Sequence, residues 1–188
     1  FDKRVRLWLL REAAFAQNGF KGLEKLAKDQ GASHPEIYYD LVAYYVKAND
    51  LHRAEEAARH GIDKITLVHQ KAVLADWLAE LAVKDNDKKL GLKTRKEAWR
   101  YEPTQERLVN WCNTNGGVLE DKQLQEEVNF LRKSEQCSKF VRLVCMLELL
   151  IGEYDLPVKA LIASDPLGWR PQSHPGQVVL PFLLLAGS

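Results

Sequence analysis

Apolar residues recur along most of the chain at the three- and four-residue spacing that marks one face of an α-helix. In the first segment, "DKRVRLWLLREAAFAQ", this spacing places Leu7, Leu10 and Ala14 on one face, and Gly19 ends the pattern. Residues 34–66 follow the same plan: a proline in a first turn, a long apolar stripe, a polar break and an alanine-rich second helix. Alternating strand patterns are short, and no glycine hairpin turns join them. The sequence therefore predicts an all-α protein.

The helical pattern repeats itself between five polar or glycine breaks. These breaks stand at Gly19, Asp50, Asp87, Glu120 and Glu153, separated by 31, 37, 33 and 33 residues. The positions twelve and nine residues before each break are apolar in every copy. The first of these columns holds Leu7, Tyr38, Ala75, Leu108 and Val141. The second holds Leu10, Leu41, Leu78, Trp111 and Val144. A third column, four residues after each break, holds Leu23, Ala54, Gly91, Leu124 and Pro157. Such a register is typical of repeat proteins, in which each unit buries its apolar stripe by stacking on its neighbours.

The spacing resembles that of the tetratricopeptide repeat, a helix-turn-helix unit of about 34 residues. The copy that carries the resemblance best contains Tyr38, Leu41, Tyr45, Ala54, Ala58 and Gly61. The resemblance implies one helical-repeat domain over residues 1–188, an open right-handed α-solenoid of about five tetratricopeptide-like helical hairpins plus a C-terminal helix. The expected repeats cover about 2–31, 34–66, 68–102, 104–134 and 137–164, and the C-terminal helix covers about 174–186.

A second, looser resemblance covers residues 34–111. The stretches "AEEAARHGIDKI" and "LADWLAELAVKDNDKKLGLKTRKEAWRYEPTQERLVNW" are similar in texture to the helical region downstream of the zinc finger in bacterial SWIM-type zinc-finger proteins. That finger needs a CxC pair followed by a further Cys and His, and this sequence has no CxC. The resemblance therefore implies a piece of a longer bacterial protein whose finger lies outside this sequence, and a first residue that is Phe agrees with that expectation.

Composition narrows the classes of function. Charged residues make up 28% of the chain, but the formal net charge is only +1, so there is no electrostatic case for binding nucleic acid or an anionic membrane. The three cysteines form no CxxC pair and are odd in number, which argues against a disulfide framework and favours the reducing cytoplasm. No secretory signal pattern opens the chain.

Motifs that would indicate catalysis, a metal or a cofactor are missing from the sequence. No phosphate-binding glycine motif, nucleophile elbow or HExxH is present. The five histidines have no metal-ligand spacing, so we expect them to face solvent or to cap helices. Cys112 and Cys145 fall in a small-residue column and are expected to fill the core. The lysine-rich run "KDNDKKLGLKTRK" is interpreted as a solvated loop between helices.

Aromatic and acidic residues share two further columns of the repeat. Trp8, Tyr39 and Asp76 each stand eleven residues before their break, and Glu12 and Glu80 stand seven before theirs. Residues four apart lie on the same helix face, and in the resembling family this first-helix face lines the groove. The five residues therefore predict a peptide groove for a basic or aromatic-containing segment. The other interpretation is that Trp8 or Tyr39 packs against a neighbouring helix, or against an upstream repeat that is not part of this sequence.

The sequence thus favours a non-catalytic protein–protein interaction module of a larger bacterial protein. The alternative is a nucleic-acid-binding helical-repeat region that assists an upstream zinc finger, and an enzyme ranks third. The partner's identity stays open.

The C-terminal segment "SHPGQVVLPFLLLAGS" is apolar but too short to span a bilayer, and Pro181 interrupts it. Ser173 or His174 is expected to cap a helix that has Pro175 in an early position. Because that helix is apolar on all sides, it is expected to be a cap on the last hairpin, the first helix of a further repeat, or an oligomer contact. The oligomeric state stays open.

Overall fold

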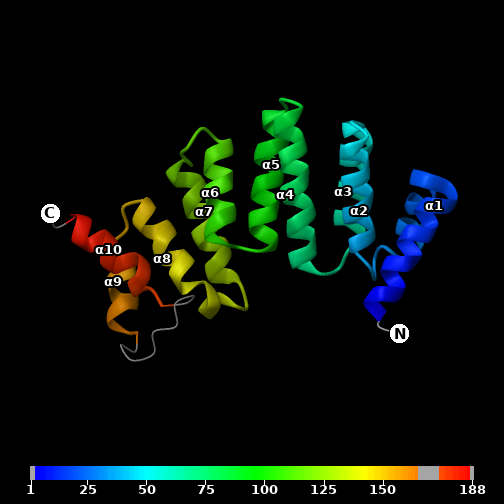
Figure 1. Ribbon diagram of the computed structural model, residues 1–188. Helices are drawn as coiled ribbons and strands as arrows, with labels where there is room; N and C mark the ends of the chain where they lie inside the picture. The colour runs from blue at the N-terminus through cyan, green and yellow to red at the C-terminus, as the bar shows by residue number, and fades with distance from the viewer. Residues whose placement is uncertain (1–2, 165–173, 187–188) are drawn as a thin grey trace. The chain divides into compact units, whose positions relative to one another are not determined.

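A computed structural model describes residues 3–164 and 174–186 (Figure 1). Within these ranges every regular element is helical, which confirms the all-α prediction. The α-helices of the first part are α1 (Lys3–Gln30), α2 (Glu36–Lys47), α3 (Leu51–Lys64), α4 (Val68–Lys84), α5 (Lys88–Tyr101) and α6 (Gln105–Thr114). They are followed by α7 (Asp121–Lys133), the 3₁₀ helix η1 (Cys137–Phe140), α8 (Val141–Leu150), α9 (Asp155–Ile162) and α10 (Gly176–Ala186).

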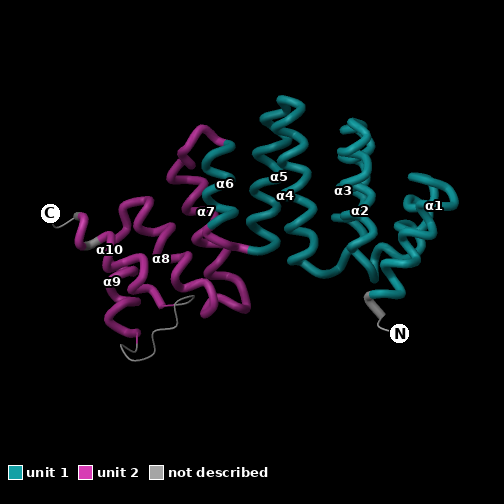
Figure 2. The backbone as a smooth tube through the Cα atoms, in the orientation of Figure 1, with its two compact units in different colours: residues 1–102, 106–114 teal, residues 103–105, 115–188 magenta. Residues whose placement is uncertain are grey.

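The chain divides into two compact units, which Figure 2 shows in different colours. Unit 1 comprises Phe1–Glu102 and Glu106–Thr114, and unit 2 comprises Pro103–Gln105 and Asn115–Ser188. The two helices expected for the fourth repeat, α6 and α7, therefore fall almost entirely in different units.

In unit 1, α1 packs on α2, α2 on α3, α3 on α4, and α4 on α5. The core between them is apolar, and its largest fully buried side chains include Tyr38, Tyr45, Leu74 and Leu78. On α2 the three- and four-residue spacing of Tyr38, Leu41 and Tyr45 brings all three side chains to the buried face. The sequence pattern thus predicts this core because one helix face carries its largest apolar residues.

The helix breaks lie where the repeat register predicts them. Gly19 adopts φ +56°, a left-handed conformation that favours glycine, and it divides α1 into two helical halves. The carboxylates of Asp50 and Asp87 cap α3 and α5 by accepting hydrogen bonds from backbone N–H groups three residues on. Glu120 forms a capping box with Gln123 at the start of α7. These local predictions are confirmed.

The interpretation of the lysine-rich run as a loop is wrong. Only the turn around Asn86 separates α4 from α5, and most of "KDNDKKLGLKTRK" belongs to α5, which Asp87 caps. The physical reason is the narrow stripe of Gly91, Thr94 and Ala98, which is buried at helical spacing while lysine and arginine occupy most of the remaining face. Long basic side chains have high helix propensity, so their charge does not argue against a helix.

In unit 2, α8 packs against α7, α9 and α10. Cys145, Leu149 and Val179 form a small buried cluster there. The backbone N–H of Gly176 donates to Nδ1 of His174, so His174 caps α10 as predicted, whereas Ser173 lies outside the described residues. One side of α10 is buried at Val179, and Leu184 and Leu185 on α10 are exposed. Among the described residues, no helix has both the length and the apolar character needed to cross a membrane.

Candidate functional site: a groove between α2 and α4

A hollow of about 300 Å³ lies between α2 and α4, the two helices that carry the predicted groove columns of the second and third repeats. We name it the α2–α4 groove. Its lining residues are Val42, Ala43, Val46, Lys47, Trp77, Glu80, Leu81 and Lys84. Apolar side chains and an indole therefore form most of the surface, and one carboxylate and two ammonium groups provide its charge. Such a surface suits an apolar or aromatic anchor residue flanked by polar contacts.

Tyr39 is half-buried, and its ring centroid is 5.8 Å from that of Trp77. Its hydroxyl donates a hydrogen bond to the backbone carbonyl of Gln70 at 3.3 Å, which links α2 to the start of α4. Burial, with a smaller contribution from Glu36, raises the pKa of Tyr39 to about 12, so the hydroxyl stays a donor at neutral pH. Tyr39 thus contacts Trp77 from beside the groove and does not line the groove itself.

Asp76 lies on α4 at the centre of an ion-pair cluster. Its Oδ1 is 3.0 Å from Nη1 of Arg95, and its Oδ2 is 2.8 Å from Nε of Arg107. Arg107 also pairs with Glu102 at 2.6 Å, and the Arg107 side chain is 13% exposed. Both carboxylate oxygens of Asp76 are therefore engaged in joining α4 to α5 and α6. The structure gives Asp76 a structural contact within unit 1.

Trp8 and Glu12 lie on the first half of α1, and both are exposed, Trp8 by 52%. Neither side chain lines the α2–α4 groove. Beside them, Nε of Arg11 is 2.8 Å from the carboxylate of Asp40 on α2. Burial raises the pKa of Asp40 above its usual value, Arg11 opposes this shift, and the nearby Glu12 adds to it. The surface between α1 and α2 therefore carries carboxylates beside an exposed indole.

Of the five predicted site residues, only Glu80 lines the hollow; Tyr39 lies next to it through Trp77. Sequence reasoning missed Trp77, Lys47 and Lys84. A signal for the lysines is present, because "VKAND" at 46–50 and "VKDND" at 83–87 are the same turn in successive repeats. Trp77 has no such signal, because the column ten residues before each break mixes apolar and polar residues: Leu9, Asp40, Trp77, Asn110 and Leu143.

The burial and contacts of the cysteines and histidines show no activated thiolate among Cys112 and Cys145 and no metal-binding cluster among the described residues. Cys137 is exposed, whereas Cys145 is buried, and burial raises the pKa of the Cys145 thiol to about 11. Burial also raises the pKa of Cys112, which is half-buried, so neither of these two thiols is activated as a thiolate. His52 and His69 are exposed, and His60 shares a hydrogen bond with the hydroxyl of Tyr38 at 3.1 Å. Over residues 3–164 and 174–186, no three His, Cys, Asp or Glu side chains gather as metal ligands would.

Comparison with known proteins gives no family for the chain. No protein-family model matches it. A search of the curated proteins also finds no match.

Proposed function

We propose that this chain is a non-catalytic protein-interaction module that binds a peptide segment of a partner protein in the α2–α4 groove. We further propose that its scaffold is an open right-handed solenoid of about five tetratricopeptide-like hairpins with an added C-terminal helix. The column four residues after each break supports the repeat, because all five of its members are buried: Leu23, Ala54, Gly91, Leu124 and Pro157. An apolar or small residue covered at the same register position in every copy is what stacked hairpins require.

The observation that carries the function is the position of the groove. It opens between α2 and α4, which occupy equivalent places in successive repeats. It includes the exposed Glu80 of the predicted groove column and the exposed Ala43, which stands seven residues before Asp50 as Glu80 stands seven before Asp87. Small and charged residues at that column leave the neighbouring Trp77 accessible as a contact surface. Aromatic rings give a large contact area for little loss of side-chain entropy, which is why they are enriched in peptide-binding surfaces.

The partner that we propose is a short segment with an apolar or aromatic anchor and a basic flank. The anchor would occupy the space above Val42, Val46 and Trp77. The basic flank would extend along α2 towards α1, where Glu12 and Glu36 are exposed. Lys47 and Lys84 line the groove as the last residues of α2 and α4, far from Glu36 at the first turn of α2. A basic flank would be repelled by these lysines and attracted towards Glu36, which would fix the direction of the segment.

A second candidate is nucleic-acid binding, and the charge of α5 is the observation that favours it. Six of its fourteen residues are lysine or arginine, against a single glutamate. However, Arg95 is paired with Asp76, Lys96 lies over the ring of Trp111, and Lys93 is 3.8 Å from Glu97. Binding through phosphate contacts would weaken steeply with salt, so retention on RNA or DNA at physiological ionic strength, lost in α5 lysine variants, would favour this candidate.

We also propose that this interaction module belongs to a longer bacterial protein of the cytoplasm. Its three cysteines are free thiols, which suits a reducing compartment.

To test the proposed function, peptides that bind the whole chain are first selected from a displayed peptide library. Their affinities for the chain are then measured by fluorescence polarisation. Ala43→Glu places a carboxylate into the groove from an exposed position, so it should weaken binding by about tenfold or more while the helix content is unchanged. Thr66→Glu adds the same charge at an exposed turn residue outside the groove and is the matched control. Equal affinities for wild type and Ala43→Glu would refute the groove as the binding site.

Tyr39 gives a second readout of the same site. Tyr39→Ala removes the ring that contacts Trp77, so Trp77 should lose its position in the groove. Peptide binding should then weaken by up to about thirtyfold, the effect of losing an interface aromatic that contributes about 2 kcal/mol. Tyr39→Phe keeps the ring and loses only the hydrogen bond to Gln70, so it should bind nearly as wild type. If Tyr39→Ala lowers the melting temperature but not the affinity, Tyr39 serves packing alone.

A further inference from the structure

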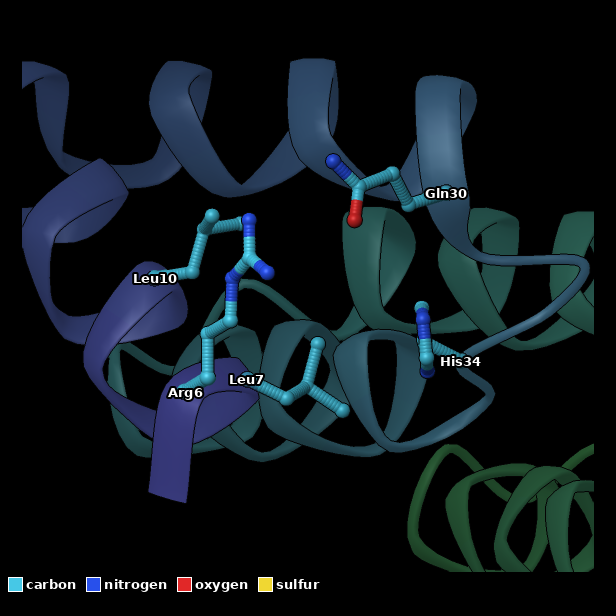
Figure 3. Close-up of a pocket in the computed structure, with 5 residues that line it drawn as sticks. All are labelled: Arg6, Leu7, Leu10, Gln30 and His34. Atoms are coloured by element: carbon cyan, nitrogen blue, oxygen red, sulfur yellow. The ribbon is translucent and has the colours of Figure 1, made fainter. Parts of the chain in front are cut away.

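A separate hollow of about 200 Å³ lies in the first hairpin, between the two halves of α1 and the turn that leads to α2. We name it the α1 hollow; it is lined by Arg6, Leu7, Leu10, Gln30 and His34 (Figure 3). The side chains of Arg6, Gln30 and His34 surround one common space, and the two leucines form its apolar wall. Within the described part of the chain, none of these three polar side chains has a hydrogen-bond or ion-pair partner.

The second hairpin shows what ordinarily fills this place. Each lining residue has an equivalent thirty-one residues on, the distance between Gly19 and Asp50. The equivalents of Arg6, Leu7, Leu10, Gln30 and His34 are, in order, Ile37, Tyr38, Leu41, Gly61 and Ile65. All five equivalents are buried. The first hairpin therefore has a polar hollow at the position where the second hairpin has a closed apolar core.

The two hairpins differ in the residue beside this space: Tyr38 in the second hairpin and Leu7 in the first. In the second hairpin the ring of Tyr38 fills the space so closely that a Cβ at Gly61 would lie 2.9 Å from its Cγ. In the first hairpin Leu7 replaces this tyrosine, so the space stays open, and Arg6 and His34 replace two buried isoleucines. Arg6 and Gln30 are exposed and His34 is half-buried, so their polar groups can be hydrated in the free protein and stay accessible to a ligand that enters the hollow.

We propose that the α1 hollow binds a carboxylate carried on a small apolar group. The guanidinium of Arg6 offers paired N–H donors that match a carboxylate, and the amide of Gln30 and the ring of His34 add further donors. Among residues 3–164 and 174–186, no acidic side chain lines the hollow to compete for these donors. Leu7 and Leu10 favour an apolar group next to the carboxylate, and the volume is too small for a nucleotide. Two sources share this chemistry: the C-terminal carboxylate of a polypeptide and a free small carboxylic acid.

The test titrates the whole ¹⁵N-labelled chain with small probes and follows amide chemical shifts. N-acetyl-leucine represents a polypeptide C-terminus and 3-methylbutanoate represents a free acid; N-acetyl-leucinamide is the neutral control. We expect saturable shifts around Leu10 and His34 with at least one of the two acids, and none with the amide. Binding of N-acetyl-leucine alone, or more tightly, identifies a polypeptide terminus, and preference for 3-methylbutanoate identifies a free acid. Equal binding of the amide, or saturable binding of inorganic phosphate but not of the acids, would overturn the proposal.

Three variants separate recognition from nonspecific attraction. Arg6→Met should weaken acid binding about tenfold or more through loss of the charged donors. Lys25→Met removes the same charge from an exposed site outside the hollow and should leave the affinity unchanged. Leu7→Tyr fills the hollow as Tyr38 fills its equivalent, so it should abolish binding while the chain keeps its charge and its helix content. Equal weakening by Arg6→Met and Lys25→Met, or unaltered binding by Leu7→Tyr, would show that the acids do not occupy the hollow.

Discussion

Replacing glycine by alanine should change the free energy of unfolding differently at two glycines in helix interiors. Gly61 lies in α3 and Gly91 lies in α5, and both are buried. A Cβ built at Gly61 would lie 2.6 Å from Cδ1 of Leu74 and 2.9 Å from Cγ of Tyr38. At Gly91 the nearest atom would be 3.5 Å away, on Thr114, which is ordinary van der Waals contact. Gly91→Ala therefore needs no rearrangement, whereas Gly61→Ala forces the fully buried Tyr38 ring to move.

The magnitudes follow from two opposing effects. Alanine in place of glycine stabilises a helix interior by about 0.8–1 kcal/mol, and this gain applies at both sites. At Gly61 overpacking of the core costs about 1–3 kcal/mol in addition. We therefore expect Gly91→Ala to raise the free energy of unfolding by about 1 kcal/mol. Gly61→Ala should leave it unchanged or lower it by up to about 2 kcal/mol.

Urea denaturation followed by circular dichroism at 222 nm measures both changes. The difference between the two variants is the overpacking cost itself, about 1–3 kcal/mol, and it does not depend on the absolute stability of the chain. If Gly61→Ala stabilises the protein as much as Gly91→Ala does, the close packing of Tyr38 is absent, and the contrast between the closed core and the α1 hollow fails with it.

The remaining predictions concern the ion-pair cluster and the thiols. Asp76→Asn keeps the shape of the side chain but removes the carboxylate that Arg95 and Arg107 share, and these two side chains are only 11% and 13% exposed. The substitution should lower the free energy of unfolding by about 1–3 kcal/mol in urea titrations. An unchanged free energy of unfolding would show that the cluster is not formed. In the native protein at pH 8, a thiol-specific disulfide reagent should modify the exposed Cys137 well before the buried Cys145, and equal rates would contradict the described burial. Folding raises the pKa of Cys145 from 9.0 to about 11, so its protonated form stabilises the fold below about pH 9, and this contribution is lost as the pH rises towards 11. The stability difference between wild type and Cys145→Ala should therefore shrink over that range, and a constant difference would contradict the shift.

Much of the helical organisation could be predicted because it depends on local signals. Helix faces follow from apolar spacing, and the breaks follow from turn residues and caps. Asn49 and Asn86 both adopt φ 59°, and each precedes a capping aspartate in the repeated sequences "VKAND" and "VKDND". Such signals occupy a few consecutive residues, so the sequence contains them in full. The lysine-rich run forms a helix and not the predicted loop, because the helical spacing of its buried small residues outweighs its charge.

The candidate sites were less predictable because their contacts are long-range. Asp76 lies in the predicted groove column, but its partners Arg95 and Arg107 are 19 and 31 residues away, and no local pattern indicates that they meet there. The tilted ring contact between Trp77 and Tyr39 depends likewise on the positions of α4 and α2, which are not adjacent in sequence. The α1 hollow had a sequence signal, since Arg6 and His34 occupy columns that hold isoleucine in the next repeat. That signal becomes informative only once burial of the isoleucines is known.

Chemical-shift mapping of a display-selected peptide on the ¹⁵N-labelled chain tests the central claim most directly. If the peptide binds to α2 and α4, the first helices of the second and third repeats, the largest shifts will fall on Ala43, Val46, Trp77 and Glu80. The shift of the Trp77 indole N–H will then give the same dissociation constant as the backbone amides. Binding to α2 and α4 would be contradicted if the shifts centred on Lys89 and Lys93 of α5, the second helix of the third repeat, while the Trp77 indole signal did not change.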